Sequence, residues 1–158
     1  MMRIVVVSGY FNPLHTGHLD YLESAKKMGE RLVVIVNNNF QVKLKGSVPF
    51  MEFEDRLRIV TALRCVDSVV GSIYENPSVV QTLKKVYELY SVDYFYESMT
   101  FANGGDRYHS DSPEENYCKA VGIRLAFGVG GEKTNSSSTL IRKSKLLKQP
   151  SEDKPKLK

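Results

Sequence analysis

Two histidines three positions apart have the types and spacing to do a defined chemistry. They are His15 and His18, within the stretch Gly-Tyr-Phe-Asn-Pro-Leu-His-Thr-Gly-His. The apolar run at 4–7 predicts a buried strand before this stretch, and the apolar spacing after it predicts an amphipathic helix. A helix that begins near Thr16 directs free N–H groups and its positive dipole end at the turn. The turn is therefore predicted to cradle a polyphosphate.

We expect the rest of this turn to contact the same ligand. Gly9 and Gly17 allow the backbone to approach it closely, because neither has a Cβ atom. The nucleotide-binding residues expected here are Gly9, Tyr10, Phe11, Asn12 and Gly17. A zinc site that joins the two histidines to Cys65 and Cys118 is possible on residue types alone. No cysteine lies at ligand spacing from the histidine pair, which disfavours that alternative.

Strands and helices alternate through the rest of the chain, as in an α/β fold with a doubly wound parallel sheet of five strands. Strands are expected at 3–8, 31–37, 67–73, 93–102 and 123–129, and helices at 17–28, 52–64, 76–90, from Ser112 and after Ser136. The segment 38–49 is expected to be a long functional loop. Ligands of such sheets bind at the carboxyl ends of the strands. The loops expected to converge there are 9–18, 37–46, 103–107 and 130–138.

The pattern H-x-G-H within G-x-F-x-P-x-H-x-G-H, directly after a first strand, resembles the signature of the cytidylyltransferase-like nucleotidyltransferases. The resemblance covers roughly residues 3–143 and is strongest to glycerol-phosphate cytidylyltransferases and heptose-phosphate adenylyltransferases. It implies a Rossmann-like fold and transfer of CMP or AMP from a nucleoside triphosphate to a small phosphorylated polyol or sugar. Pyrophosphate would leave by direct in-line displacement, and Mg²⁺ would be held mainly by the triphosphate.

Later segments carry the same resemblance. Leu44-Lys45-Gly46 is similar to the heptose-phosphate adenylyltransferases, which implies a catalytic set of His15, His18 and Lys45. Gly104-Gly105-Asp106 resembles a segment that lies over the nucleotide, and the serines before Leu140 resemble a phosphate-binding helix start. Further nucleotide contacts are therefore expected at Gly105, Asp106, Ser136, Ser137, Ser138 and Thr139. Substrate contacts are expected at Asn37, Lys43, Arg56 and Arg107.

Structural alternatives stay open for several of these residues. Lys43 is as readily a solvated loop residue, and Arg56 has the helical spacing to pair with Glu52. The Asn-Gly segment at 103–105 is also typical of an ordinary turn, and the serine cluster of an N-cap.

The sequence also departs from the family pattern. Tyr10 stands where many members have Thr or Ser, and Asn12 replaces the commoner Asp. The arginine of the cytidylyltransferase Arg-Thr-Glu-Gly segment is absent, and Lys133 is the nearest substitute. These departures leave the choice between CTP and ATP open. Two other classes are alternatives, namely an inactive nucleotide-binding or sensor module and an adenylate-forming synthetase core.

Composition excludes several other classes of protein. The chain has 158 residues and a net charge of +4, but residues 142–158 hold seven basic against two acidic side chains. The remainder is near neutrality, which argues against a nucleic-acid-binding face. No apolar run reaches the ~20 residues that span a bilayer. We expect one domain at 1–148, a disordered basic tail at 149–158 and, from the two unpaired cysteines, a cytoplasmic location. A concentration of tyrosines in the second half predicts a homodimer.

Overall fold

The fold is organised around a parallel sheet of five strands in the order β3-β2-β1-β4-β5. The computed structural model describes residues 1–105, 111–131 and 136–147. The strands are β1 (Met2–Gly9), β2 (Arg31–Val36), β3 (Ser68–Gly71), β4 (Tyr96–Gly104) and β5 (Arg124–Val129). The doubly wound parallel α/β fold predicted from the sequence is confirmed.

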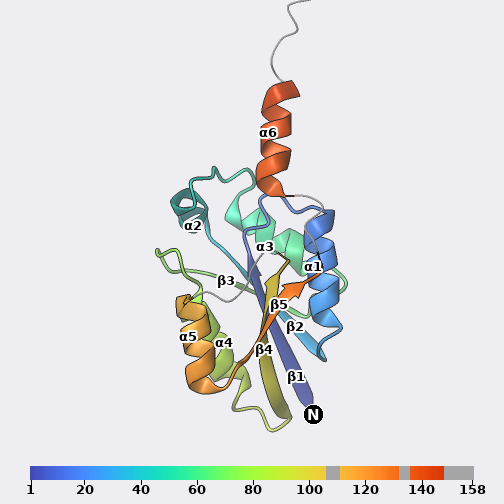
Figure 1. The fold of residues 1–158 in the computed structure, drawn as a ribbon, viewed down its shortest axis with the longest axis vertical. Coiled ribbons are helices and arrows are strands. Elements are labelled where there is room, and N and C mark those ends of the chain that lie inside the picture. The colour runs from blue at the N-terminus through green and yellow to red at the C-terminus, as the bar shows by residue number, and fades with distance from the viewer. Residues whose placement is uncertain (106–110, 132–135, 148–158) are drawn as a thin grey trace, which may run out of the picture.

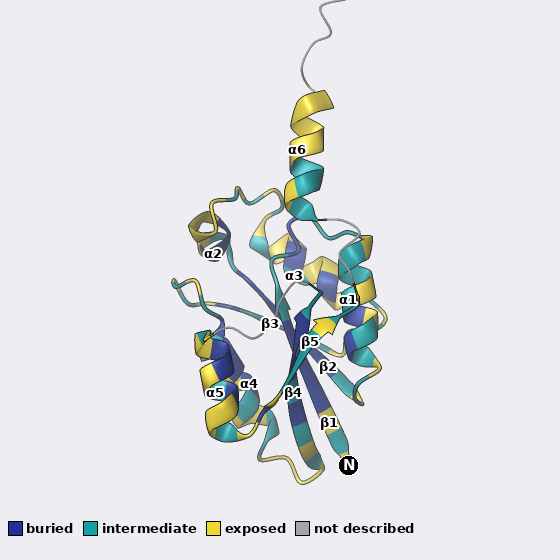
Figure 2. Cartoon of the chain, viewed as in Figure 1, coloured by how far each residue is buried: buried dark blue, intermediate teal, exposed yellow. Residues whose placement is uncertain are grey.

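Helices cover both faces of the sheet (Figure 1). The helices of the described residues are α1 (Thr16–Lys26), α2 (Asn39–Leu44), α3 (Phe53–Thr61), α4 (Val80–Tyr90), α5 (Pro113–Val121) and α6 (Ser137–Leu147), of which α6 covers neither face. Alternate residues of β1 enter opposite cores, because successive strand side chains point to opposite faces. Val5 and Val7 pack with Leu22 of α1, whereas Ile4 and Val6 pack with Leu83 of α4. The central strands are therefore apolar on both faces and buried (Figure 2).

The order in which strands are added to the sheet reverses at its centre. From β1 the chain winds outward to β2 and β3, and it then crosses to β4 on the other side of β1. Val5 of β1 accordingly pairs with Leu32 on one side and Thr100 on the other. The carboxyl ends of β1 and β4 thus flank the switch point where ligands of such sheets bind. Helix α6 lies beyond this edge (Figure 1).

Three element predictions were wrong in their bounds. The expected loop at 38–49 contains α2, because Asn38 is an N-cap whose side chain accepts from the N–H of Gln41. Helix α4 begins at Val80, since the Asn76 side chain instead closes a turn by accepting from the N–H of Ser78. Strand β4 is displaced toward the C-terminus and continues through Asn103 into Gly104. This last shift places Asn103 and Gly104, for which an ordinary turn was the alternative, within β4.

The tyrosines on which the homodimer prediction rested are divided between core and surface. Tyr87, Tyr90 and Tyr96 pack against the core under α4, whereas Tyr94 is 90% exposed. Most of the aromatic surplus therefore belongs to the core margin, and the homodimer stays a prediction. Within the described ranges, no helix combines the length and apolar character needed to cross a bilayer.

A buried guanidinium connects the chain segments that leave β1 and β2. Arg56 of α3 is fully buried, and its Nη1 donates to the carbonyl oxygens of Tyr10 at 2.7 Å and Asn37 at 2.6 Å. Its Nε donates to the Met51 carbonyl at 3.1 Å, and its Nη2 to Asn39 Oδ1 at 2.8 Å. Burial lowers the pKa of Arg56 from its ordinary value. The hydrogen bonds to four acceptors offset the cost of burying this cation.

Removing this guanidinium should destabilise the fold. We expect Arg56→Met to lower the free energy of unfolding by about 3 kcal/mol or more, because each buried carbonyl left without a donor costs about 1–3 kcal/mol. Urea denaturation measures the difference. Arg58→Met, at an exposed position of the same helix, is the matched control and should stay within about 0.5 kcal/mol of the wild type. Equal stabilities for the two variants would contradict the bridging role.

The pair Arg3–Glu30 predicts a pH dependence of stability. Hydrogen bonds from Arg3 lower the pKa of the Glu30 carboxyl to about 2, from an ordinary value of 4.5. The ionised carboxylate therefore stabilises the fold above pH 4.5, and this contribution is lost as the pH falls through about 2. The difference in melting temperature between wild type and Glu30→Gln should shrink over that window. Glu75→Gln, in an exposed loop, should show no such trend; a constant difference for Glu30→Gln would refute the linkage.

Candidate functional site

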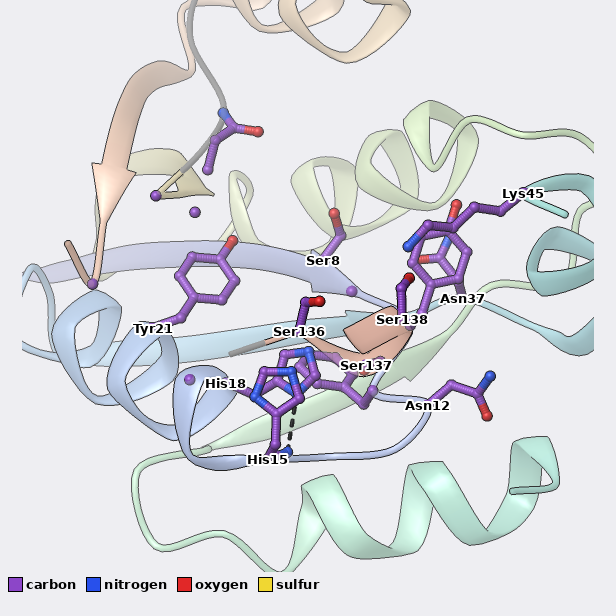
Figure 3. Close-up of a pocket in the computed structure, with 18 of the residues that line it drawn as sticks. Ser8, Asn12, His15, His18, Tyr21, Asn37, Lys45, Ser136, Ser137 and Ser138 are labelled. Atoms are coloured by element: carbon purple, nitrogen blue, oxygen red, sulfur yellow. Dashed lines mark hydrogen bonds between the residues drawn. The ribbon is translucent and has the colours of Figure 1, made fainter. Parts of the chain in front are cut away.

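A cavity of about 300 Å³ lies at the carboxyl end of the sheet, over the switch point. Its walls come from the turn after β1, the start of α1, the end of α2, the end of β4 and the start of α6 (Figure 3). The sequence-predicted residues that line it are Gly9, Tyr10, Phe11, Asn12, His15, Gly17, His18, Asn37, Lys45, Gly105, Ser136, Ser137 and Ser138. Loops far apart in the sequence thus meet in one site, as the predicted topology requires.

The two histidines form a stacked pair at the start of α1. Their ring centroids lie 3.8 Å apart with an angle of 27° between the planes. The backbone N–H of His15 donates to Nδ1 of His18 at 3.2 Å. Because Nδ1 accepts this bond, a neutral His18 ring carries its proton on Nε2. Phe11 packs against the His18 ring in a T-shaped arrangement, with the two ring centroids 5.0 Å apart.

The turn before the histidine pair is held in place by the packing of Phe11 against Gly9. Phe11 is buried with a positive φ of 50°, and its ring lies under Gly9. A Cβ atom on Gly9 would stand 2.8 Å from that ring, so glycine is needed there for the aromatic side chain. Packing of Phe11 thus explains the glycine without a ligand, and close approach of a ligand at Gly9 stays a prediction.

Asn12 binds a neighbouring loop with all its amide atoms. Its Oδ1 accepts from the N–H groups of Phe50 at 2.6 Å and Met51 at 3.1 Å, and its Nδ2 donates to the Val48 carbonyl at 2.8 Å. An aspartate at this position would lack the Nδ2 donor. The departure from the commoner Asp therefore matches a loop that needs both a donor and an acceptor.

Lys45 and Asn37 line the cavity from the β2 side. The ammonium of Lys45 lies 4.3 Å from the centroid of the Tyr10 ring. Asn37 is buried, and its Nδ2 donates to Gln41 Oε1 at 3.1 Å. Lys43 is exposed on α2 and is not part of the wall, and neither is Arg56, whose guanidinium is bound to backbone carbonyls. Lys43 and Arg56, which were expected to contact substrate, therefore lie outside the cavity wall.

Three serines at the start of α6 line the cavity. Ser136 Oγ accepts from the N–H of Thr139 at 3.1 Å, so that Ser136 satisfies a free N–H group at the helix start. Its hydroxyl also donates to Thr139 Oγ1 at 2.8 Å, and Thr139 itself does not line the cavity. Ser137 Oγ donates to the Pro13 carbonyl at 2.9 Å, which connects this helix to the histidine turn.

Several residues of the wall were missed from the sequence. Tyr21 was assigned only to the apolar face of α1, but it lines the cavity and its hydroxyl donates to the Ala102 carbonyl. It packs against Gly130, of the expected loop 130–138, which has a φ of +90°; a Cβ atom there would stand 2.8 Å from the Tyr21 Cα, so only glycine fits. The buried carboxylate of Glu114 also lines the wall and accepts from the N–H of Val79 at 2.8 Å. No periodicity in the sequence distinguishes these residues from ordinary core or cap residues.

Two predicted residues, Asp106 and Arg107, lie outside the described residues, as do Lys133 and the tail at 149–158. The zinc alternative is wrong, because Cys65 and Cys118 pack in the cores on opposite faces of the sheet. Among the residues that the structure describes, no group of three or more His, Cys, Asp or Glu side chains can hold a metal ion.

The sequence model of the cytidylyltransferase-like family matches residues 6–144 of this chain. A bifunctional protein HldE from Hydrogenovibrio crunogenus is 46% identical over 77 residues, which are 48% of this chain and 16% of that protein. Its counterpart in Coxiella burnetii is 44% identical over the same length, with the same coverage of 48% and 16%. The matched region is thus a small part of these relatives.

Two solved structures are similar in fold. The lipopolysaccharide core biosynthesis protein of Thermoplasma volcanium has a TM-score of 0.62 and 25% identity, over 80% of this chain and 94% of that one. A putative nicotinate-nucleotide adenylyltransferase of Vibrio parahaemolyticus has a TM-score of 0.60 and 18% identity, over 95% and 90%. The second likeness concerns the fold alone. Because the family model spans nearly the whole described chain, the protein belongs to the cytidylyltransferase-like family.

Proposed function

We propose that this protein is a nucleotidyltransferase that transfers CMP or AMP from a nucleoside triphosphate to a small phosphorylated polyol or sugar. The observation that carries the proposal is the stacked pair of His15 and His18 at the start of α1, in one cavity with Lys45 and the α6 serines. Imidazole N–H groups, an ammonium and a helix start are groups that bind phosphate oxygens. Their convergence suits a chain of phosphates better than any single anion.

The reaction is a direct displacement at phosphorus. A phosphate oxygen of the acceptor forms a bond to the α-phosphorus, and the bond from that phosphorus to the oxygen bridging to the β-phosphate breaks. The bonding electrons leave with pyrophosphate, so no covalent enzyme intermediate is needed. Catalysis then consists of orienting the two substrates and stabilising the charge on the leaving group.

Each catalytic side chain has a role in that charge stabilisation. His18, with its proton on Nε2, donates to the β- or γ-phosphate, and His15 supports it by stacking. Lys45 places a compact positive charge where the pyrophosphate leaves. The N–H groups and hydroxyls at the start of α6 bind the remaining oxygens.

Mg²⁺ would accompany the triphosphate in this proposal. The described residues supply no carboxylate cluster, so the phosphates and water would provide most of its ligands. The ion would neutralise phosphate charge when bound.

The acceptor class rests on the relatives. A phosphorylated sugar or polyol accords with the resemblance stated from the sequence and with the likeness to a protein of lipopolysaccharide core biosynthesis. Two free thiols, at Cys65 and Cys118, suit the cytoplasm as the site of this activity. A homodimer is part of the same proposal, as is the absence of nucleic-acid and membrane partners.

Pyrophosphate release tests the function directly. Purified protein with Mg²⁺ should release pyrophosphate from CTP or from ATP when a matching polyol or sugar phosphate is present. Each triphosphate is assayed separately against a panel of such acceptors. The same panel without phosphate groups is the control, because the proposed nucleophile is a phosphate oxygen. If neither triphosphate turns over with any acceptor, the result would contradict the proposed activity and favour an inactive nucleotide-binding module.

A second prediction isolates the His18 donor. In His18→Asn the amide oxygen stands near the position of Nδ1 and can accept from the His15 N–H, whereas the Nε2 donor is gone. We expect kcat to fall by roughly two to three orders of magnitude, because loss of one preorganised donor typically costs about 3–4 kcal/mol. The melting temperature should stay within a few degrees of the wild type. A folded variant with nearly normal kcat would refute the phosphate-binding role.

A further inference from the structure

The side chain of Lys45 rests on an aromatic ring of the cavity wall. Its ammonium lies 4.3 Å from the centroid of Tyr10, within the range of a cation–π interaction. Both residues line the same cavity, and Lys45 extends into it from the end of α2 (Figure 3). We propose that Tyr10 is a positioning residue whose ring holds the Lys45 ammonium over the phosphate site.

The ring of Tyr10 stands on fixed backbone. Its carbonyl oxygen accepts from Arg56 Nη1 at 2.7 Å, and the next residue, Phe11, is buried to 1% exposure. Asn12 is in turn bound to the loop through Phe50 and Met51. The turn therefore presents the Tyr10 ring from a rigid base.

The backbone of Lys45 is held as well. Lys45 ends α2, and its N–H donates to the carbonyl of Gln41 at 3.1 Å. Gln41 is fully buried, and its Nε2 donates to the carbonyls of Asn76 at 2.9 Å and Ser78 at 3.2 Å. Both ends of the contact therefore have anchored backbones.

The Tyr10 ring can restrict the conformations of the Lys45 side chain. An exposed lysine samples many rotamers, and ordering it opposes binding of any anion. A ring face restricts the ammonium to the cavity without neutralising its charge, as a carboxylate partner would do. The ammonium keeps the ring contact while its N–H groups donate to phosphate oxygens. This role gives a reason for tyrosine at a position where the related signature commonly has a small hydroxyl residue.

The role in catalysis rests on the proposed function, but binding of inorganic pyrophosphate tests the contact without turnover. Isothermal titration calorimetry is used with the full chain and the variants Tyr10→Phe, Tyr10→Leu and Lys45→Met, and with the double variant of the last two. Tyr10→Phe retains the ring and should bind pyrophosphate within about twofold of wild type. Tyr10→Leu should bind about 2- to 30-fold more weakly, the range of a cation–π contact.

The double variant decides whether Tyr10 acts through the lysine. In the Lys45→Met background, Tyr10→Leu should change the dissociation constant by less than twofold. Multiplicative effects of the two changes would overturn the positioning role and leave the proposed function intact. If the wild type itself binds no pyrophosphate, the phosphate cradle and the proposed function fail together.

A matched control exists in the same chain. Lys85 lies 5.2 Å from the Tyr74 ring, away from the cavity wall. Tyr74→Leu removes a contact of the same kind and should leave pyrophosphate binding unchanged. An equal loss in Tyr74→Leu and Tyr10→Leu would show a general effect of losing a tyrosine and would overturn the proposal.

Nuclear magnetic resonance tests the contact in the unmutated protein, in case Tyr10→Leu does not fold. With ¹³Cε-labelled lysine, the Hε signals of Lys45 should be shielded by the ring current, and Lys45→Met assigns them. The signals should stay shielded when pyrophosphate is added, because the ammonium keeps the ring contact in the complex; loss of the shielding on binding would overturn the positioning role. Unshielded Lys45 signals in the free protein would overturn the proposal.

Discussion

The site depends on one buried cation. Where parallel strands end, their chains diverge, and here the segments leaving β1 and β2 both present carbonyl oxygens to Arg56. A guanidinium is planar and has five donors, so it can hold several such carbonyls in a fixed relation where a lysine could not. The histidine turn begins at one of these carbonyls and the segment to α2 at the other. Helix α3 thus fixes the distance between the two parts of the cavity that hold His18 and Lys45.

The same arrangement explains why the cavity holds its shape without metal or disulfide among the described residues. Asn12 connects the histidine turn to the loop before α3, and Gln41 connects α2 to the segment before α4. Each amide serves as donor and acceptor at once, and both side chains are buried. Buried polar groups with complete hydrogen bonding make a scaffold rigid, since any displacement leaves an unpaired group.

The sequence predicted the fold and about half of the residues of the cavity wall because both depend on local patterns. Apolar runs located the strands, and H-x-G-H located the turn, since neither needs knowledge of distant contacts. Arg56 was misplaced because an arginine on an amphipathic helix looks the same whether it faces solvent or a carbonyl cluster. Tyr21 and Glu114 were not predicted to line the cavity because the residues they contact are remote in sequence. Gly130 packs against Tyr21, and Ser78 donates a hydrogen bond to Glu114. Helix α2 was hidden by asparagines that resemble a loop but in fact cap it.

Helix α6 has no buried residue, although its first turn forms one wall of the cavity. Ser137 and Pro13 supply a hydrogen bond at that turn, and the helix then extends away from the domain. If an anion binds its N–H groups as we propose, that anion would become part of what keeps this helix folded. Binding and local folding would then be one equilibrium, in which the ligand takes the place of a hydrophobic core. The occupied and empty proteins would differ in amide protection along α6 even where their average coordinates coincide.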